Sequence, residues 1–460
     1  MKKFFKKIKE FIIKTINYIK KIFSFAEEDE NATTNENQSI NEPIDKDNIK
    51  FGEIGAYLLY NKELSSITDE FVNAVKDLGI NLLYVNTPRK KDNPTTFEEW
   101  LDIFNKFENS GIKLMLYIYE AVSMTPKWTN EQIKTITNHP SFYSWVAEDE
   151  VTYKSFKTTK AWVKKFYNEK WEDGTRKWPN IAICYLPKLS RLVPDSIGNN
   201  YSDYLNLWSQ VIDIAHADMY PFISDQTNKS QYNIEGDGVP VYGKYEGFEK
   251  WFDYLKEHCA FTNNNPNITH RLYIQCCKHI SNDNNDKLYI SRPKPTELTI
   301  KIQSYANLMS GSNGLMLFLI NDLLSDGGKG FTEAAFNDRL EINKDTYNIL
   351  KSTFNSNVFK NYKNIIVNLK TTDVIWGDEY DLSKFIDNKT NRNDLLISTS
   401  ENNSYEYCSL LNTSLENDIT IIPSDDVKIV NLDELTETTN VFGEEYILKP
   451  GNLMLIKKQK

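Results

Sequence analysis

Several features that would assign a function class are absent from this chain of 460 residues. No apolar run reaches the roughly twenty residues that a membrane-spanning helix needs. No glycine-rich turn follows any of the early apolar segments, so a nucleotide-binding fold has no positive support. The net charge is −10. An acidic chain of this kind is a poor candidate for nucleic-acid binding, and we expect no such partner.

Cysteine chemistry gives no site either. The five cysteines are Cys184, Cys259, Cys276, Cys277 and Cys408, and none belongs to a CxxC pair. We therefore expect free thiols and neither a zinc site nor a disulfide framework. No other ligand spacing indicates a metal, and no cofactor is predicted. Aromatic residues are abundant, with 26 Tyr, 24 Phe and 9 Trp, enough to fill a core and to line a cleft with rings.

The first 50 residues differ from the rest of the chain. Residues 1–25 carry eight lysines against one glutamate, with apolar residues at three- and four-residue steps. This pattern predicts a basic amphipathic helix that attaches to an anionic membrane surface or to a groove on a partner. A solvated or locally packed helix is the alternative. Lysines interrupt the apolar run, so no cleavable signal peptide is expected. Residues 26–50 are acidic and polar, as in a flexible linker.

From 51 to 368 the sequence alternates between strand-like and helix-like segments. The strand candidates are 54–60, 80–86, 112–120, 142–147, 181–186, 214–220, 271–276 and 314–320, each apolar on both faces as buried parallel strands are. Amphipathic segments follow at 68–78, 97–110, 130–138, 156–171, 201–211, 248–259, 297–309 and 346–353. Eight strands alternating with eight helices predict a closed (β/α)8 barrel. A doubly wound open sheet is the structural alternative, but it normally uses fewer units.

The pattern changes in residues 369–460. Short alternating runs are separated there by Asn, Asp, Ser and Pro-Gly turn residues. This favours an antiparallel β-sandwich that packs against the barrel.

The fourth strand candidate ends in three consecutive acids. Ser141-Phe-Tyr-Ser-Trp-Val-Ala leads directly into Glu148, Asp149 and Glu150, and a helix-like segment follows. Adjacent carboxylates repel one another, so they lie either in a solvated loop or in a site that uses their charge. Barrel enzymes place their catalytic groups at the carboxyl ends of the strands. We therefore interpret the other strand ends as parts of one candidate site.

The remaining strand ends carry carboxylates, amides and tyrosines. They are Tyr57 and Tyr60, Asn86, Tyr117, Tyr119 and Glu120, Tyr185, His216, Asp218 and Tyr220, Gln275, and Asn321 and Asp322. Rings that stack on sugar faces and polar groups that hold hydroxyls suit a neutral polyhydroxylated ligand. Carbohydrate is therefore the predicted ligand class. A phosphorylated substrate would require arginines or a phosphate-gripping loop, and neither is evident.

Four segments resemble those of a known family. His-Pro-Ser-Phe-Tyr-Ser-Trp-Val-Ala-Glu-Asp-Glu (139–150) resembles the HPxxxxW…DEP strand of glycoside-hydrolase-like (β/α)8 barrels, which are related to the clan of retaining β-glycosidases. Ala-Asp-Met-Tyr-Pro-Phe (217–222) resembles their DxYPF sixth strand. Residues 297–318 resemble their seventh helix and the glycine that leads into strand eight, and 448–456 the last strand of the sandwich that often follows. The resemblance covers roughly residues 50–460.

The resemblance implies roles for particular residues. Glu150 matches the general acid/base at the end of strand four, and Asp149 would contact a sugar hydroxyl. Val151 stands where the family often has proline. The family's nucleophilic glutamate on strand seven is replaced here by Gln275, which cannot attack an anomeric carbon. Another carboxylate, Asp218 or Glu120, then serves as nucleophile or base, or the strand is misaligned, or the site binds without cleaving.

Two functions follow from these alternatives. The first is hydrolysis of an oligo- or polysaccharide, with Glu150, Asp218 and Glu120 as catalytic candidates. Its substrate-binding candidates are Glu148, Asp149, Tyr60, Asn86, Tyr119, Tyr185, Tyr220, Gln275 and Asn321. The second is a non-catalytic barrel that binds a glycan or a protein and is tethered through residues 1–25 to a membrane or a larger assembly. The Lys-, Asn- and Ile-rich composition suits a bacterium or its phage, and a virion component is one form of this second function.

Overall fold

A computed structural model describes residues 53–87, 95–123, 127–151, 153–185, 208–218, 220–225, 237–242, 248–283, 286–325, 327–376, 384–389, 394–441 and 443–460. The amphipathic helix and the linker predicted for residues 1–50 lie outside these ranges, as does most of the helix predicted at 201–211. Within the described ranges, no helix combines the length and apolarity that a membrane crossing requires.

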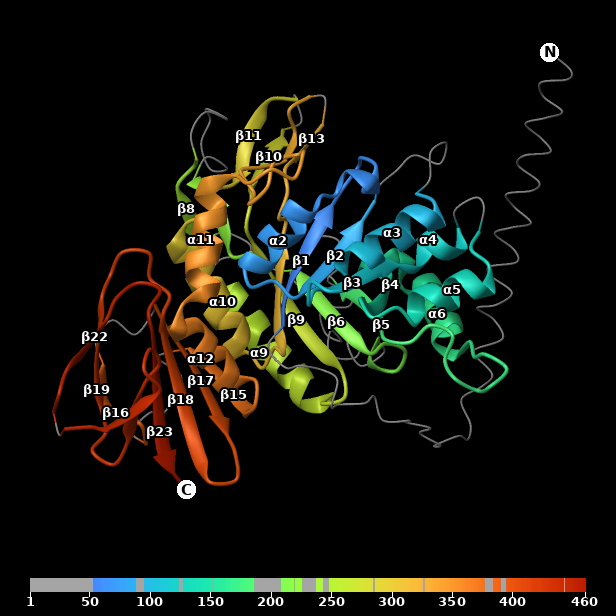
Figure 1. The fold of residues 1–460 in the computed structure, drawn as a ribbon. Coiled ribbons are helices and arrows are strands. Elements are labelled where there is room, and N and C mark those ends of the chain that lie inside the picture. The colour runs from blue at the N-terminus through green and yellow to red at the C-terminus, as the bar shows by residue number, and fades with distance from the viewer. Residues whose placement is uncertain are drawn as a thin grey trace, which may run out of the picture.

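Eight parallel strands close into a barrel, as the sequence predicted (Figure 1). They are β1 (Glu53–Leu59), β2 (Leu82–Asn86), β3 (Lys113–Tyr117), β4 (Phe142–Val151), β5 (Ile181–Tyr185), β6 (Ile214–Asp218), β9 (Thr269–Gln275) and β12 (Gly314–Phe318). The order around the barrel is β1-β12-β9-β6-β5-β4-β3-β2, so each strand pairs with its sequence neighbours and β12 closes onto β1. The carboxyl ends of all eight strands therefore meet at one mouth.

Helices surround the barrel. They are α2 (Asp69–Asp77), α3 (Phe97–Phe107), α4 (Ile118–Val122), α5 (Asn130–Thr137), α6 (Tyr153–Asn168), α9 (Phe248–Asn264), α10 (Glu297–Met309), α11 (Lys344–Asn355) and α12 (Asn357–Ile366). Capping boxes at Thr96, Thr129 and Thr296 fix the starts of α3, α5 and α10. These caps determine where the loops that precede α3, α5 and α10 end and where these helices begin.

Two boundaries near the mouth differ from the prediction. The strand expected at 112–120 ends at Tyr117, and the chain turns there into the short helix α4. The strand expected to end at residue 147 continues instead through the three acids to Val151. Helix α12 was not predicted, because the sequence pattern indicated only one helix after the last strand.

Additional strands extend beyond the mouth. A four-stranded antiparallel sheet, which we call the cap sheet, has the order β11-β10-β14-β13 and lies at the top of Figure 1. Its strands are β10 (Lys278–Asn282), β11 (Leu288–Arg292), β13 (Leu323–Leu324) and β14 (Gly330–Thr332). A two-stranded hairpin, β7 (Phe222–Ser224) and β8 (Pro240–Tyr242), follows β6. The cap sheet therefore joins the loop after β9 to the loop after β12.

The C-terminal part forms two antiparallel sheets, at the lower left of Figure 1. The larger has the order β15-β17-β18-β23-β20-β21, and the smaller the order β16-β19-β22. The strands are β15 (Lys370–Trp376), β16 (Ile386–Lys389), β17 (Leu395–Glu401), β18 (Tyr405–Asn412), β19 (Ile419–Pro423), β20 (Lys428–Asn431), β21 (Thr436–Thr439), β22 (Tyr446–Leu448) and β23 (Leu453–Gln459). Apolar side chains such as Ile397, Leu410 and Ile421 fill the space between the sheets.

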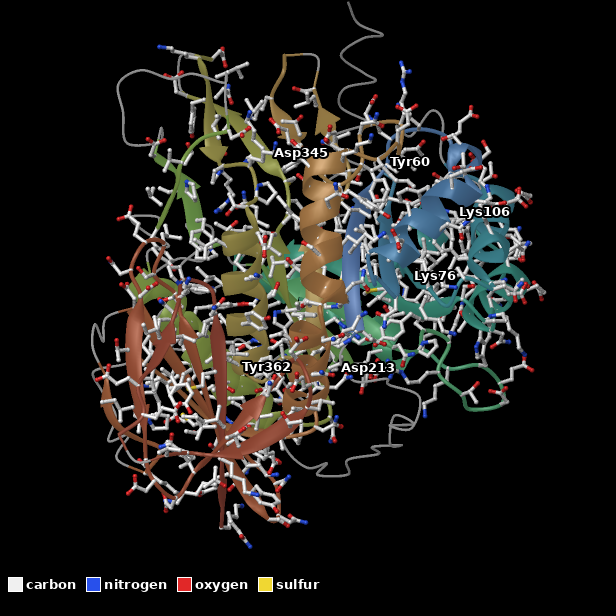
Figure 2. The ribbon with its side chains drawn as sticks, turned by 60° about the vertical axis from the view of Figure 1, so that its left-hand side comes forward. Tyr60, Lys76, Lys106, Asp213, Asp345 and Tyr362 are labelled. Carbon is white, nitrogen blue, oxygen red and sulfur yellow. The ribbon has the colours of Figure 1, made fainter. Side chains whose placement is uncertain are left out.

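The larger sheet also packs on the barrel helices. The hydroxyl of Tyr362 on α12, labelled in Figure 2, donates to Ser409 Oγ at 3.0 Å. Ser398 on β17 donates to the carbonyl of Met309 at the end of α10 at 2.8 Å. Both contacts are buried, so the larger sheet supports the side of the barrel. The Tyr242 hydroxyl on β8 also donates to the Thr413 carbonyl, directly after β18, at 2.6 Å.

The barrel separates two apolar cores. The outer core lies between strands and helices and contains the fully buried Trp100, Trp145 and Trp178. The inner core fills the lumen and contains Tyr57, Tyr84, Met115, Val146, Tyr273 and Met316. A polar layer closes the lumen at the amino ends of the strands. There Arg271 is fully buried and paired with Glu53, and its second nitrogen, Nη1, is 3.3 Å from Nε2 of His216.

Candidate functional site

The three acids of β4 reach the mouth through irregular pairing. The register between β4 and β5 shifts between Val146 and Glu148 and again between Glu148 and Val151. In a regular strand, consecutive side chains point to opposite faces, so only one of Glu148 and Asp149 would face the lumen. The shifts relax this alternation, as β-bulges do beside active sites. Both carboxylates are hydrogen-bonded to tyrosines of the inner core.

Asp149 is held across the lumen. The Tyr57 hydroxyl on β1 donates to Asp149 Oδ2 at 3.3 Å, and Asn86 Nδ2 on β2 donates to the Tyr57 oxygen at 2.6 Å. Burial, followed by the negative charge of Asp149, raises the pKa of Tyr57 well above its usual value. The phenol therefore stays protonated and remains a donor to the carboxylate.

Glu148 is held in a similar way by the neighbouring strand. The Tyr117 hydroxyl on β3 donates to Glu148 Oε1 at 2.8 Å, and the backbone N–H of Asp149 donates to the same oxygen at 3.3 Å. Burial is the main cause that raises the pKa of Tyr117, and the charge of Glu148 adds to it. Two consecutive acids are thus each oriented by a neutral phenol.

Asp218 brings a further carboxylate to the mouth from β6. Burial does most to raise the pKa of Tyr273, and the negative charges of Asp149 and Asp218 both contribute. The two acids therefore lie near one hydroxyl from β4 and β6, the two strands on either side of β5 in the barrel. Asp218 pairs in register with Tyr273, and the ring of Tyr57, whose hydroxyl donates to Asp149, has its centre 6.4 Å from that of Tyr273.

Tyr220 lies just beyond Asp218 and is packed by an arginine. The Arg292 guanidinium on β11 lies 4.8 Å from the centre of the Tyr220 ring. Its Nη1 donates to the carbonyls of Tyr220 at 3.0 Å and Phe222 at 3.3 Å. No sequence pattern indicated Arg292, since the cap sheet that carries it was not predicted.

Asp322 lies between β12 and β13 and is partly buried. Its Oδ1 accepts a hydrogen bond from the backbone N–H of Ala334 at 2.9 Å. Burial raises the pKa of Asp322 to about 6, and the nearby acids Glu333 and Asp338 add to that effect. The carboxyl group therefore titrates near neutral pH, unlike an ordinary surface aspartate.

Glu120 does not reach the mouth. It lies on α4, and its carboxylate is buried on the outer side of the barrel. Thr87 Oγ1 donates to Oε1 at 3.0 Å, and Trp100 Nε1 donates to Oε2 at 3.4 Å. Because the chain turns after Tyr117, Glu120 anchors α4 to α3 and to the loop after β2.

Three other predicted ligand-binding residues have structural contacts. Tyr60 is buried in the outer core, where its hydroxyl is hydrogen-bonded to Ser66. Asn321 clamps the end of β1, since it donates to the Leu59 carbonyl at 2.9 Å and accepts from the Leu59 N–H at 3.2 Å. These contacts occupy both polar atoms of the Asn321 amide. The third residue is Gln275.

Gln275 ends β9, the seventh barrel strand, and is buried. Its Nε2 donates to the carbonyls of Cys277 and Pro293, both at 3.0 Å. Its backbone N–H donates to Gln303 Oε1 on α10, also at 3.0 Å. The amide therefore ties the start of the cap sheet to the loop before α10.

Two predicted residues are described only through their backbone. Glu150 lies within β4 and Tyr185 is the last residue of β5, but their side chains fall outside the described set. Where side chains are described, no cluster of three or more His, Cys, Asp or Glu residues could hold a metal ion.

Comparison with known proteins places the fold. No protein-family model matches the sequence, and no curated protein matches it. A β-galactosidase from Bacillus circulans sp. alkalophilus superposes with a TM-score of 0.57 at 9% identity, over 89% of this chain and 99% of that one. Gan42B, a GH42 β-galactosidase from G. stearothermophilus, gives a TM-score of 0.51 at 8% identity, over 89% and 98%. At sequence identities this low, the similarity to these structures shows the fold alone. The chain has the glycoside-hydrolase-like (β/α)8 barrel fold, followed by C-terminal antiparallel sheets.

Proposed function

We propose that this protein binds an oligo- or polysaccharide at the barrel mouth and hydrolyses a glycosidic bond there. The observation that carries the proposal is the placement of two carboxylates around Tyr273. Asp218 pairs with it in register, and Asp149 is hydrogen-bonded to Tyr57, whose ring contacts that of Tyr273. Carboxylates at the carboxyl ends of barrel strands, surrounded by phenols, are the groups that glycoside hydrolysis requires. The fold likeness to two β-galactosidases agrees with this reaction class.

The roles follow from position along the strands. Glu150, at the end of β4, would donate its proton to the glycosidic oxygen as the bond to the anomeric carbon breaks. Asp218 on β6 would attack that carbon or take a proton from the attacking water. Asp149, fixed by Tyr57, would accept a hydrogen bond from a sugar hydroxyl. Asp218 is preferred to Glu120 as the second carboxylate because the Glu120 oxygens accept from Thr87 and Trp100.

A non-catalytic glycan-binding barrel is the second candidate. Gln275 favours it, because this amide occupies the strand-seven position and is hydrogen-bonded to two backbone carbonyls. A site without a strand-seven acid can still hold a sugar through its other carboxylates and rings. In this case residues 1–25 would tether the barrel to a membrane surface or a larger assembly.

Reducing-sugar release from a broad glycan panel separates the two candidates. Hydrolysis at this mouth is supported if the parent releases sugar and the variants Glu150→Gln and Asp218→Asn each lose about two orders of magnitude or more of that activity. Glu131→Gln, an exposed acid on α5, is the matched control and should retain parental activity. Binding without release by the parent would favour the second candidate. If no glycan is bound or cleaved, both candidates fail.

A further inference from the structure

An exposed aromatic ring lies beside the acids of β4. Tyr119 on α4 is 47% exposed, so about half of this large side chain faces solvent. One face stacks on Tyr117, with ring centres 6.0 Å apart and planes inclined by 24°. Tyr117 is itself fixed, because its hydroxyl donates to Glu148. The outer ring therefore rests on a rigid support, with a broad apolar surface toward solvent.

Glu148 offers a hydrogen-bond acceptor next to this ring pair. Both of its hydrogen bonds to described residues, from the Tyr117 hydroxyl and the Asp149 N–H, go to Oε1. Oε2 accepts none from the described residues. The carboxylate is thus oriented through one oxygen and retains the other for a donor from outside the protein.

We propose that Tyr119 and Glu148 Oε2 form a binding subsite for one neutral pyranose ring, on the β3–β4 side of the mouth. The Tyr119 ring would stack on the C–H face of the sugar, and Oε2 would accept from a sugar hydroxyl. Tyr117 is the positioning residue, because it supports the ring and orients the carboxylate. This subsite rests on the proposed function, since it extends a glycan chain bound at the same mouth.

Charge restricts the sugar class. Glu148 and Asp149 are consecutive carboxylates, and Glu148 accepts only from neutral groups among the described residues. A uronic acid bound over Tyr119 would bring a further negative charge close to both. A neutral hexose or pentose carries hydroxyl donors without that repulsion. The subsite therefore favours neutral over acidic glycans.

The test measures binding by the full chain carrying Glu150→Gln, so that ligand is not consumed. The probes are galacto-, manno-, xylo- and cello-tetraose, with tetragalacturonate as the acidic counterpart, titrated by calorimetry. Tyr119→Ala should weaken the best neutral ligand about tenfold, as truncation of an aromatic contact does. Tyr119→Phe keeps the ring, so its affinity for the same ligand should be within about twofold of that of the Glu150→Gln protein. Tyr446→Ala, a tyrosine on the distant β22, is the matched control.

The outcomes are distinguishable from failure of the proposed function. If the best neutral ligand binds the Tyr119→Ala variant as tightly as it binds the Glu150→Gln protein alone, the subsite is refuted while glycan binding stands. If tetragalacturonate binds as tightly as the neutral probes, the sugar class is refuted. If no probe binds and the parent also releases no sugar from the glycan panel, the proposed function fails and the subsite fails with it.

Discussion

Removing the charge of Glu53 tests the polar layer that closes the lumen. Arg271 has no exposed side-chain surface, and Glu53 is the anionic partner that its Nη2 contacts. Nη2 also donates to the Tyr143 hydroxyl, and Nη1 lies beside His216. Neither partner carries charge, because burial raises the pKa of Tyr143 to about 12 and lowers that of His216 well below its usual range. Glu53→Gln therefore leaves a buried guanidinium without its counter-charge.

The cost is large compared with the total stability of a domain. Breaking a buried ion pair by removing one partner typically costs about 3–5 kcal/mol. Glutamine keeps the size of the side chain and one acceptor oxygen, so we expect the lower end, about 3 kcal/mol. A loss of that size is a substantial part of the roughly 5–15 kcal/mol that stabilises a domain. Urea unfolding followed by circular dichroism measures it.

Two comparisons make the reasoning refutable. Asp338→Asn removes an exposed ion pair with Lys62. The side chain of Asp338 is 61% exposed and that of Lys62 is 39% exposed, so the loss should be less than about 0.5 kcal/mol. The double variant Glu53→Leu with Arg271→Met replaces both charges with apolar groups and should recover much of the loss. If Glu53→Gln costs less than about 1 kcal/mol, the guanidinium is solvated in solution and the buried-pair account is wrong.

Two further predictions concern the mouth and the closure of the barrel. Gly314→Ala would place a Cβ 2.2 Å from the Glu53 carbonyl oxygen where β12 meets β1, so it should cost about 2 kcal/mol in urea unfolding. Gly327→Ala meets no atom within 4 Å and should change little; equal losses in the two variants would contradict the close-approach argument. Burial raises the pKa of Asp322 to about 6, so the stability that its protonated form contributes is lost as pH rises through that value. Asp322→Asn should therefore gain melting temperature relative to the parent at pH 7 but not at pH 4, and a gain independent of pH would count against it.

The barrel was predictable because its strands are buried on both faces. A continuous apolar run between two polar, helix-like segments is a strong local signal, and all eight barrel strands lie where such runs occur. Helix α10 matches the predicted 297–309 at both ends, since the capping box at Thr296 marks its start. The local sequence was therefore sufficient to predict the end of an element wherever a local contact, such as a helix cap, determines that end.

The site was less predictable because it depends on where strands end. Ile118-Tyr119-Glu120 continues the apolar pattern of β3, yet the chain turns into α4 after Tyr117. That turn sends Glu120 to the outer core, although a strand extended to residue 120 would have placed it at the mouth. The cap sheet shows a second reason why sequence patterns could not predict the site. Its pairing of Lys278 with Thr332 joins residues far apart in the sequence, which no local pattern records.

The mouth combines negative charge with neutral support. Tyr57 and Tyr117 each orient one of two consecutive carboxylates, and a phenol whose pKa is raised gives a hydrogen bond without a counter-charge. Arg292, beside Tyr220, stacks on that ring and donates to two backbone carbonyls. A ligand entering here therefore meets Glu148, an oriented acceptor whose hydrogen bonds from the described residues come from neutral groups. Hydroxyl donors satisfy such acceptors and anions do not, which is the physical reason to expect a neutral sugar at this mouth.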